Sequence, residues 1–351
     1  MTALPIRRLS KLLLALAIGA AGGAGATWLG LPLPWMIGAL AATTAAAMAG
    51  APIALPARLR SVMIALLGVM LGSGFSPAIL EHLADWAASL SALVGYTAVA
   101  GGASMLYFQR VAGYDRPTAF FSAMPGGLSE MILVGGALGG DARVISLVHS
   151  SRLLLVVLSL PFAFQLLAGY EPAARPPAGP GLGDIPAADL AVLAACGLAG
   201  FLGARALRLP AAAVVGPMVL SAGVHLAGWT AARPPVELVA AAQVVVGTAV
   251  GCRFAGVALG LIGRTVVLAG GSTFILVAVA VGFALAMNGA TGLPVPALVL
   301  AYAPGGLAEM SLIALALSLD AAFVATHHLL RVFLIVVLAP TFFRARARGG
   351  A

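Results

Sequence analysis

The chain contains two copies of one sequence motif, joined end to end. Residues 117–161 align with residues 296–340 without a gap, and glycines and prolines earlier in the two halves match at nearly the same offset. Pro-Gly-Gly, Glu, Asp, His and Arg all fall in one register. A bias toward leucine or alanine cannot produce this agreement, so we infer a duplication. It divides the chain into a first membrane repeat (1–169), a linker (170–188) and a second membrane repeat (189–351).

Each repeat consists of six apolar segments with few charges between them. Charged residues make up 9% of the chain and hydrophobic residues 62%, against about 25% and 45–50% in soluble domains. A soluble fold cannot cover its surface with so few charges, and lipid is the other environment that accepts this much apolar surface. The sequence therefore predicts an all-α, polytopic membrane protein. The net charge of +8 comes from scattered arginines without a basic stripe, so we expect no nucleic-acid partner.

The fifth apolar segment of each repeat decides the topology, because a Pro-Gly-Gly motif interrupts it at Pro125 and at Pro304. Proline removes a backbone donor, and each glycine lowers helix propensity by about 1 kcal/mol. If the broken segment crosses the membrane, each repeat has six spans and the halves are parallel. If it is a re-entrant hairpin, each repeat has five spans and the halves are inverted. The re-entrant model leaves only Arg175 and Arg233 of the loop arginines outside, so the positive-inside rule favours it.

We therefore predict an inverted repeat, in which each copy has five transmembrane helices plus one re-entrant, broken hairpin. Both termini are expected in the cytoplasm of a bacterial cell, the protein is expected in the inner membrane, and the linker 170–188 is expected in the periplasm. The predicted partners are the lipid bilayer and a small solute, moved with a proton or another coupling ion. Whether the chain also pairs with copies of itself as a homo-oligomer stays open.

Two broken segments at matching positions of an inverted repeat indicate a transporter site near the bilayer midplane. An acid follows each break, and the next helix carries a histidine and an arginine one turn apart, with the arginine about 15 Å deep. Amides at the start of the helix after each break suit an anion. The candidate substrate and coupling residues are Pro125, Gly126, Gly127, Glu130, His149 and Arg152 in the first repeat and Pro304, Gly305, Gly306, Glu309, His328 and Arg331 in the second.

Three interpretations of these acids and arginines stay open. In the first, each Glu–Arg pair is a buried structural bridge between hairpin and helix, and the histidine is hydrogen-bonded in the bundle. In the second, Glu130 and Glu309 carry protons. In the third, Arg152 and Arg331 bind an anionic substrate that displaces the carboxylate. For the breaks themselves, the plainer alternative is a tight hairpin tip without a ligand.

The remaining polar residues indicate no enzyme chemistry. Asp141 and Asp320 are expected to cap the last helix of each repeat. The adjacent His327 and His328 would point about 100° apart on a helix, which argues against a shared metal ion. Cys196 and Cys252 lie in apolar stretches without a ligand pattern. We therefore expect no metal, no cofactor and no catalytic residue.

The duplicated units PGGLSEM…D…H..R and PGGLAEM…D…H..R resemble the duplicated membrane AbrB family of bacteria, over essentially the whole chain. Members of that family are labelled as AbrB family regulators or as ammonia monooxygenases, and an enteric member is linked to regulation of gene expression. The resemblance implies a membrane location and supplies no catalytic residues. The label is shared with a small soluble DNA-binding regulator, which this sequence does not resemble.

We expect a secondary transporter or exchanger of a small solute, with an anion as one candidate. Two alternatives stay open. A membrane regulator or sensor of gene expression would need a cytoplasmic partner, and no cytoplasmic loop exceeds about ten residues. An enzyme related to ammonia monooxygenase would need a metal site, for which five histidines and two separated cysteines give no convincing ligand set.

Overall fold

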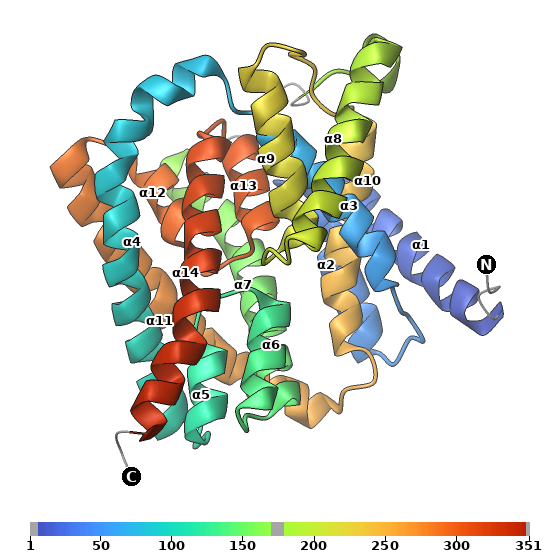
Figure 1. Cartoon of the computed structure of the whole chain (residues 1–351). Helices are drawn as coiled ribbons and strands as arrows, with labels where there is room; N and C mark the ends of the chain where they lie inside the picture. Colours follow the sequence, from blue (N-terminus) through green and yellow to red (C-terminus); the bar gives the residue numbers. More distant parts are fainter. Residues whose placement is uncertain (1–5, 170–178, 349–351) are drawn as a thin grey trace. The chain divides into compact units, whose positions relative to one another are not determined.

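The computed structural model describes residues 6–169 and 179–348, and residues 1–5, 170–178 and 349–351 lie outside the described part. Every regular element in the described part is a helix, so the predicted all-α class is confirmed (Figure 1). Residues 170–178 of the predicted linker, including Arg175, fall outside the described residues. The remainder of the linker contains the short 3-10 helix η2, Leu182–Asp184.

The chain forms two compact units, and neither repeat is a compact unit by itself. Unit 1 consists of Met1–Pro77, Val157–Ile262 and Leu315–Ser318; unit 2 consists of Ala78–Val156, Gly263–Ala314 and Leu319–Ala351. Each unit therefore takes helices from both repeats. The candidate residues of the two broken segments all belong to unit 2.

Unit 1 contains three helices from each repeat, packed through glycines. They are α1 (Ile6–Trp28), α2 (Pro34–Met48) and α3 (Ala57–Gly72), and their counterparts α8 (Ala187–Ala206), α9 (Ala212–Leu226) and α10 (Val236–Gly251), which the short 3-10 helix η3 (Cys252–Phe254) follows. Gly22 of α1 lies on Gly38 of α2, and Gly200 of α8 lies on Gly216 of α9. The glycines let the paired backbones approach more closely than larger residues would allow.

The third helix of each repeat packs on the second helix of the other repeat. A Cβ built on Gly68 of α3 would lie 2.6 Å from the carbonyl oxygen of Val214 in α9, and one on Gly247 of α10 would lie 2.6 Å from that of Met36 in α2. The two contacts join equivalent positions of the duplicated sequence. The third helix of each copy thus packs on the other copy: α3 of the first repeat lies on α9, and α10 of the second repeat lies on α2.

This close packing predicts that Gly68→Ala destabilises the protein. The new methyl group would press on the α9 backbone, which cannot rotate away as a side chain can, and overpacking of this kind costs about 1–3 kcal/mol. The measurement is thermal unfolding of the purified protein in detergent, followed by circular dichroism. Gly223→Ala in α9 is the matched control, because its Cβ would meet nothing within 4 Å. Equal melting temperatures for the two variants would contradict the packing argument.

Seven helices in the described residues are long and apolar enough to cross a membrane. They are α1, α4, α7, α8, α11 and α14, together with α10 when it is counted with η3 as Val236–Phe254. Three of the ten helices predicted as spans are shorter: α2 and α9 have 15 residues and α3 has 16. At 1.5 Å per residue they measure about 22–24 Å, less than a hydrocarbon core of about 30 Å. Proline at the first helical position of α2 and glycine soon after its end limit its length.

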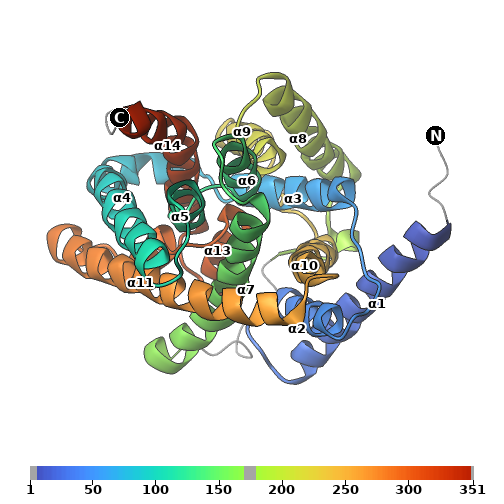
Figure 2. The same ribbon diagram turned by 90° about the horizontal axis from the view of Figure 1, so that it is seen from below.

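Unit 2 contains the long helices and both broken segments. Its helices are α4 (Pro77–Arg110), α5 (Arg116–Ala123), α6 (Leu128–Ala137), the first half of α7 (Ala142–Ala168), α11 (Leu259–Thr291), α12 (Val295–Tyr302), α13 (Leu307–Ala316) and α14 (Ala321–Arg348). The equivalent helices α4 and α11 lie side by side (Figure 2), and Ser104 Oγ and Ser272 Oγ form a 2.6 Å hydrogen bond between them.

The helix breaks and the helix caps lie where the sequence predicted them. The first Pro-Gly-Gly motif lies between α5 and α6 and the second between α12 and α13. Asp141 Oδ1 accepts hydrogen bonds from the first amides of α7, at 2.9 and 3.1 Å. Asp320 Oδ1 does the same for α14, at 2.9 and 3.0 Å. Each cap fixes the start of the helix that carries the candidate histidine and arginine.

Candidate functional site

The glycines of the two breaks provide space for neighbouring side chains. Neither motif contains a glycine with positive φ, so the chain does not need their conformational freedom for a left-handed turn. A Cβ on Gly127 would collide with the carboxylate of Glu130, and one on Gly306 would collide with that of Glu309. A Cβ on Gly126 would lie 2.7 Å from Ile335 Cγ2 of α14. The glycines therefore allow an acid and a neighbouring helix to approach the broken backbone.

In the first repeat, a histidine and an arginine of α7 bind the last carbonyls of α5. His149 Nε2 lies 2.8 Å from the carbonyl oxygen of Phe121, and Arg152 donates to those of Ser122 at 3.3 Å and Met124 at 3.4 Å. Arg152 also lies 2.9 Å from His149 Nδ1. Because arginine only donates, Nδ1 must accept, which places the histidine proton on Nε2. The ring is therefore a neutral tautomer that donates to the backbone.

The second repeat repeats this geometry at the same offset. His328 Nε2 donates to the carbonyl oxygen of Leu300 at 2.8 Å, and its Nδ1 accepts from Arg331 at 2.9 Å. Arg331 donates to the carbonyl oxygens of Ala303 at 2.5 Å and Gly305 at 2.7 Å. Arg331 is 1% exposed and His328 is fully buried. We call these two sets, His149 with Arg152 and His328 with Arg331, the Arg–His pairs.

The arginines thus neutralise the carbonyl ends of α5 and α12, where a helix carries partial negative charge. The Glu–Arg bridge considered from the sequence stays a prediction. The hydrogen bonds of Arg152 and Arg331 given above join backbone carbonyls and histidine. The carbonyls at each break lie next to the guanidinium, and buried carbonyls require partners.

The two carboxylates lie at the opposite end of each break. Glu130 is the third residue of α6 and Glu309 the third residue of α13, and each carboxylate folds over the glycine that precedes its helix. This is the position at which a glutamate stabilises the positive end of a helix. Glu309 is 6% exposed, whereas Glu130 is half-buried. Each break therefore holds a cation at the end of one helix and an acid at the start of the next.

Residues of α4 connect the two breaks. Met124, at the first break, contacts Gly101, and Tyr302, at the second, packs on Tyr96 with ring centroids 5.4 Å apart. Gly101 and Tyr96 are about 7.5 Å apart along the helix. The breaks accordingly lie close together within unit 2.

Several buried polar atoms near the breaks have no hydrogen-bond partner in the described part of the chain. They are Ser122 Oγ and Ser151 Oγ in the first repeat and Ser311 Oγ and Arg331 Nε in the second. Buried polar groups are normally paired. These atoms therefore provide hydrogen-bonding capacity that water or a polar solute could use.

Sequence reasoning missed Tyr96, Tyr302, Ser89 and the role of His327. Tyr302 donates to the carbonyl oxygen of Ser89 at 2.9 Å, and His327 Nε2 lies 2.9 Å from Ser89 Oγ. The signal was weak: these are single polar residues within apolar runs. His327 and His328 have separate partners, and no group of three or more His, Cys, Asp or Glu side chains in the described residues could hold a metal ion.

Comparison with known proteins finds similarity along nearly the whole chain. The family model described as "Transition state regulatory protein AbrB" matches residues 35–347. A protein of Bacillus subtilis (strain 168) named "Uncharacterized protein YhjN" is 29% identical, over 94% of this chain and 91% of that protein. A protein of Escherichia coli (strain K12) named "Putative regulator AbrB" is 25% identical, over 90% of each chain.

Proposed function

This chain belongs to the AbrB family, and we propose that it is an integral membrane transporter. It would move a small solute, with an anion as the favoured class, by secondary transport or exchange and without enzymatic chemistry. The observation that carries this proposal is the same Arg–His pair at a broken helix in both repeats. Non-helical backbone at membrane depth is tolerated where protein buries it or where it lines a water-filled cavity, and discontinuous helices are typical of transporter sites.

We further propose that each broken segment is a re-entrant hairpin and that the repeats are inverted. Three contacts support this. Successive residues of α7 bond successive residues of α5, so the two helices run parallel: His149 meets Phe121 and Arg152 meets Met124. Thr118 Oγ1, near the start of α5, accepts from the amide of Asp141, just before α7, at 2.8 Å. A segment whose two ends meet enters and leaves on one side, which gives an odd number of spans per repeat.

This topology places both termini in the cytoplasm and the linker in the periplasm of a bacterial inner membrane, with the short helices α2, α3 and α9 crossing as parts of unit 1. A cysteine-accessibility experiment tests it, starting from a variant without the native Cys196 and Cys252. Leu182→Cys, in the exposed linker, is expected to react with an impermeant maleimide in intact cells with a permeabilised outer membrane. Ala258→Cys, in the loop before α11, is expected to react only after the inner membrane is opened. The reverse pattern would overturn the topology.

The proposed coupling ion is a proton. In many transporters, carbonyls at the end of a broken helix coordinate Na⁺. Here guanidinium groups already bind those carbonyls, so Na⁺ has little left to coordinate. Glu309 is a buried carboxylate at the other end of the break and can exchange a proton. An anionic solute would be stabilised by the helix N-termini that Glu130 and Glu309 now cover.

The proposal is tested by reconstitution into liposomes and a screen of small anionic and neutral solutes, with proton flux followed by an internal pH dye. We expect at least one solute to move faster than in protein-free liposomes, with a rate that depends on pH and not on Na⁺. Background flux for every solute and for protons would overturn the transport proposal. A Na⁺-dependent rate would retain transport and overturn the proton coupling.

A regulatory function is the second candidate, because the family description and the name of the Escherichia coli relative both refer to a regulator. A membrane regulator would act through a cytoplasmic partner. Affinity purification after crosslinking in cells, with the Glu309→Gln variant as a comparison, distinguishes the two. Stoichiometric capture of one transcription factor by both proteins would favour regulation, since that binding would not depend on the broken helices.

A further inference from the structure

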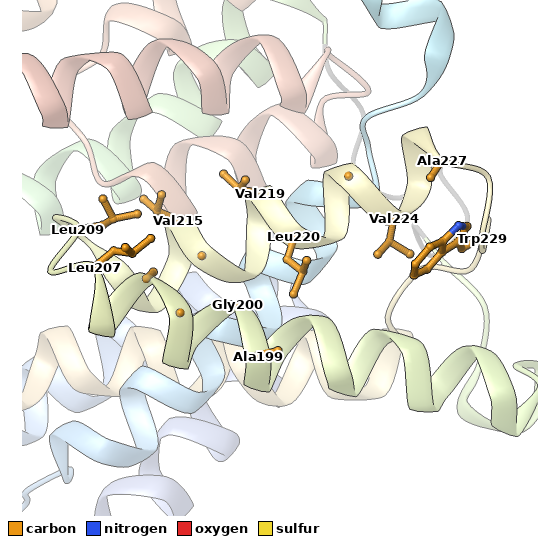
Figure 3. Close-up of a pocket in the computed structure, with 14 residues that line it drawn as sticks. Ala199, Gly200, Leu207, Leu209, Val215, Val219, Leu220, Val224, Ala227 and Trp229 are labelled. Carbon is orange, nitrogen blue, oxygen red and sulfur yellow. The ribbon is translucent and has the colours of Figure 1, made fainter.

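A long apolar groove lies between α8 and α9 in unit 1 (Figure 3). Its volume is about 500 Å³, and its walls are small or aliphatic residues, among them Gly200, Gly203, Val219 and Gly223. Leu207 and Leu209 lie at one end and Trp229 at the other. The groove follows α9, whose 15 residues extend about 22 Å, more than one leaflet of a hydrocarbon core about 30 Å thick.

The two ends of the groove differ in charge. Arg205 and Arg208 are exposed on either side of Leu207, at the end where α8 turns into α9. The loop at the Trp229 end carries charges of both signs: Thr230 donates to Asp189 at 2.7 Å, and Arg233 is exposed. An elongated apolar ligand with an anionic head therefore fits best with its head at Arg205 and Arg208, two exposed arginines three residues apart.

We propose that this groove holds an acyl chain of an anionic phospholipid, whose phosphate binds Arg205 and Arg208. The inference rests on the proposed membrane location but not on transport. Phosphate is a ligand that arginine binds through paired hydrogen bonds, and basic residues near a membrane surface attract anionic lipids. Trp229, 75% exposed, is of the residue type that anchors at the opposite membrane interface.

The duplication supports a lipid site that is specific to the second repeat. The equivalent helices α1 and α2 pack through Gly22 and Gly38 in the same manner. At the positions equivalent to Arg205 and Arg208, however, the first repeat has Thr27 and Gly30. Close helix packing therefore does not require the arginines. In the proposed topology they lie on the cytoplasmic side, as the positive-inside rule expects, where anionic lipids of that leaflet are within reach.

A second copy of the chain fits the groove less well. Membrane homodimers are related by an axis along the membrane normal, which would bring identical levels of two copies together. Arg205 and Arg208 would then face their own counterparts, and like charges oppose association. A phospholipid covers the same apolar walls and neutralises the arginines.

The experiment is native mass spectrometry of the purified full chain in detergent, with added palmitoyl-oleoyl phosphatidylglycerol or phosphatidylcholine. We expect the wild-type protein to retain phosphatidylglycerol in preference, by about fivefold for each arginine. Gly203→Leu is expected to abolish this retained lipid, because a side chain there enters open space in the groove. Gly25→Leu is the matched control: it is the equivalent position of the first repeat and equally open.

A second pair of variants tests the head of the ligand. Arg205→Gln with Arg208→Gln is expected to equalise binding of the two lipids, whereas Arg143→Gln, at the exposed start of α7, is expected to leave the preference intact. Unchanged phosphatidylglycerol binding by Gly203→Leu would overturn the proposal. If Gly203→Leu converts a dimer to a monomer without changing the bound lipid, the groove belongs to a second copy, and the lipid proposal is overturned as well. Either readout is independent of solute flux.

Discussion

Replacing Arg331 with alanine is expected to lower the free energy of unfolding by about 3–5 kcal/mol. The guanidinium group binds the carbonyl oxygens of Ala303 and Gly305 at 2.5 and 2.7 Å in a site that is 1% exposed. Its removal leaves both carbonyls and His328 Nδ1 without their donor, and each orphaned buried group costs about 1–3 kcal/mol. The measurement is thermal or denaturant unfolding in detergent, followed by circular dichroism.

Three comparisons make this test specific. Arg152→Ala is expected to cost less, because its bonds to Ser122 and Met124 are 3.3–3.4 Å long. Arg331→Lys is expected to be intermediate, since a single ammonium group cannot satisfy two carbonyls in the manner of a planar guanidinium. Arg143→Ala, at an exposed position, should change stability by no more than about 0.5 kcal/mol. If Arg331→Ala unfolds like Arg143→Ala, the Arg–His pair does not hold the break.

The second large effect is expected for Glu309→Gln, which should reduce the proposed transport by about 10- to 100-fold. Glutamine has nearly the shape of glutamate and can still fold over Gly306, so the protein should remain folded. It cannot exchange a proton and carries no charge at the start of α13. The measurement is solute and proton flux in liposomes across a range of pH. We expect the residual flux of the variant to be independent of pH where the wild-type flux is not.

Glu130→Gln is the matched control for the same position of the first repeat. Glu130 is half-buried whereas Glu309 is 6% exposed, so the effect of Glu130→Gln is expected to be smaller. Wild-type flux and an unchanged pH profile for Glu309→Gln would exclude this carboxylate as the proton carrier. Loss of flux together with a lowered melting temperature would instead assign it a structural role.

The duplicated register predicted the helix breaks, the capping role of Asp141 and Asp320, and the position of His149 and Arg152 on one face of a helix. These features depend on local chain chemistry and helix periodicity, both of which a sequence carries directly. The partner of each arginine could not be read in this way. Opposite charges suggested Glu130 and Glu309. The hydrogen bonds to backbone carbonyls could not be predicted, because every residue has a carbonyl and it becomes available only where a helix ends.

The division into compact units also depends on packing that the duplication does not encode. The duplication gives the bounds of the repeats but not which helices pack together, and the contacts of Gly68 and Gly247 join different repeats. The shorter lengths of α2, α3 and α9 reflect where proline and glycine end a helix rather than how long the apolar run is. Tyr96 and Tyr302 were missed because a single tyrosine in an apolar run is indistinguishable from a core residue until its neighbours are known.

The packing of α3 and α10 on the opposite copy has a consequence for biosynthesis. When the ribosome has completed the first copy, the glycine face of α3 has no surface to pack on, since α9 has not yet been translated, and α2 still lacks α10. In the proposed membrane location, the first copy therefore stays incompletely packed until the second copy has been translated. Two half-length chains produced together should assemble, while either one alone should be degraded.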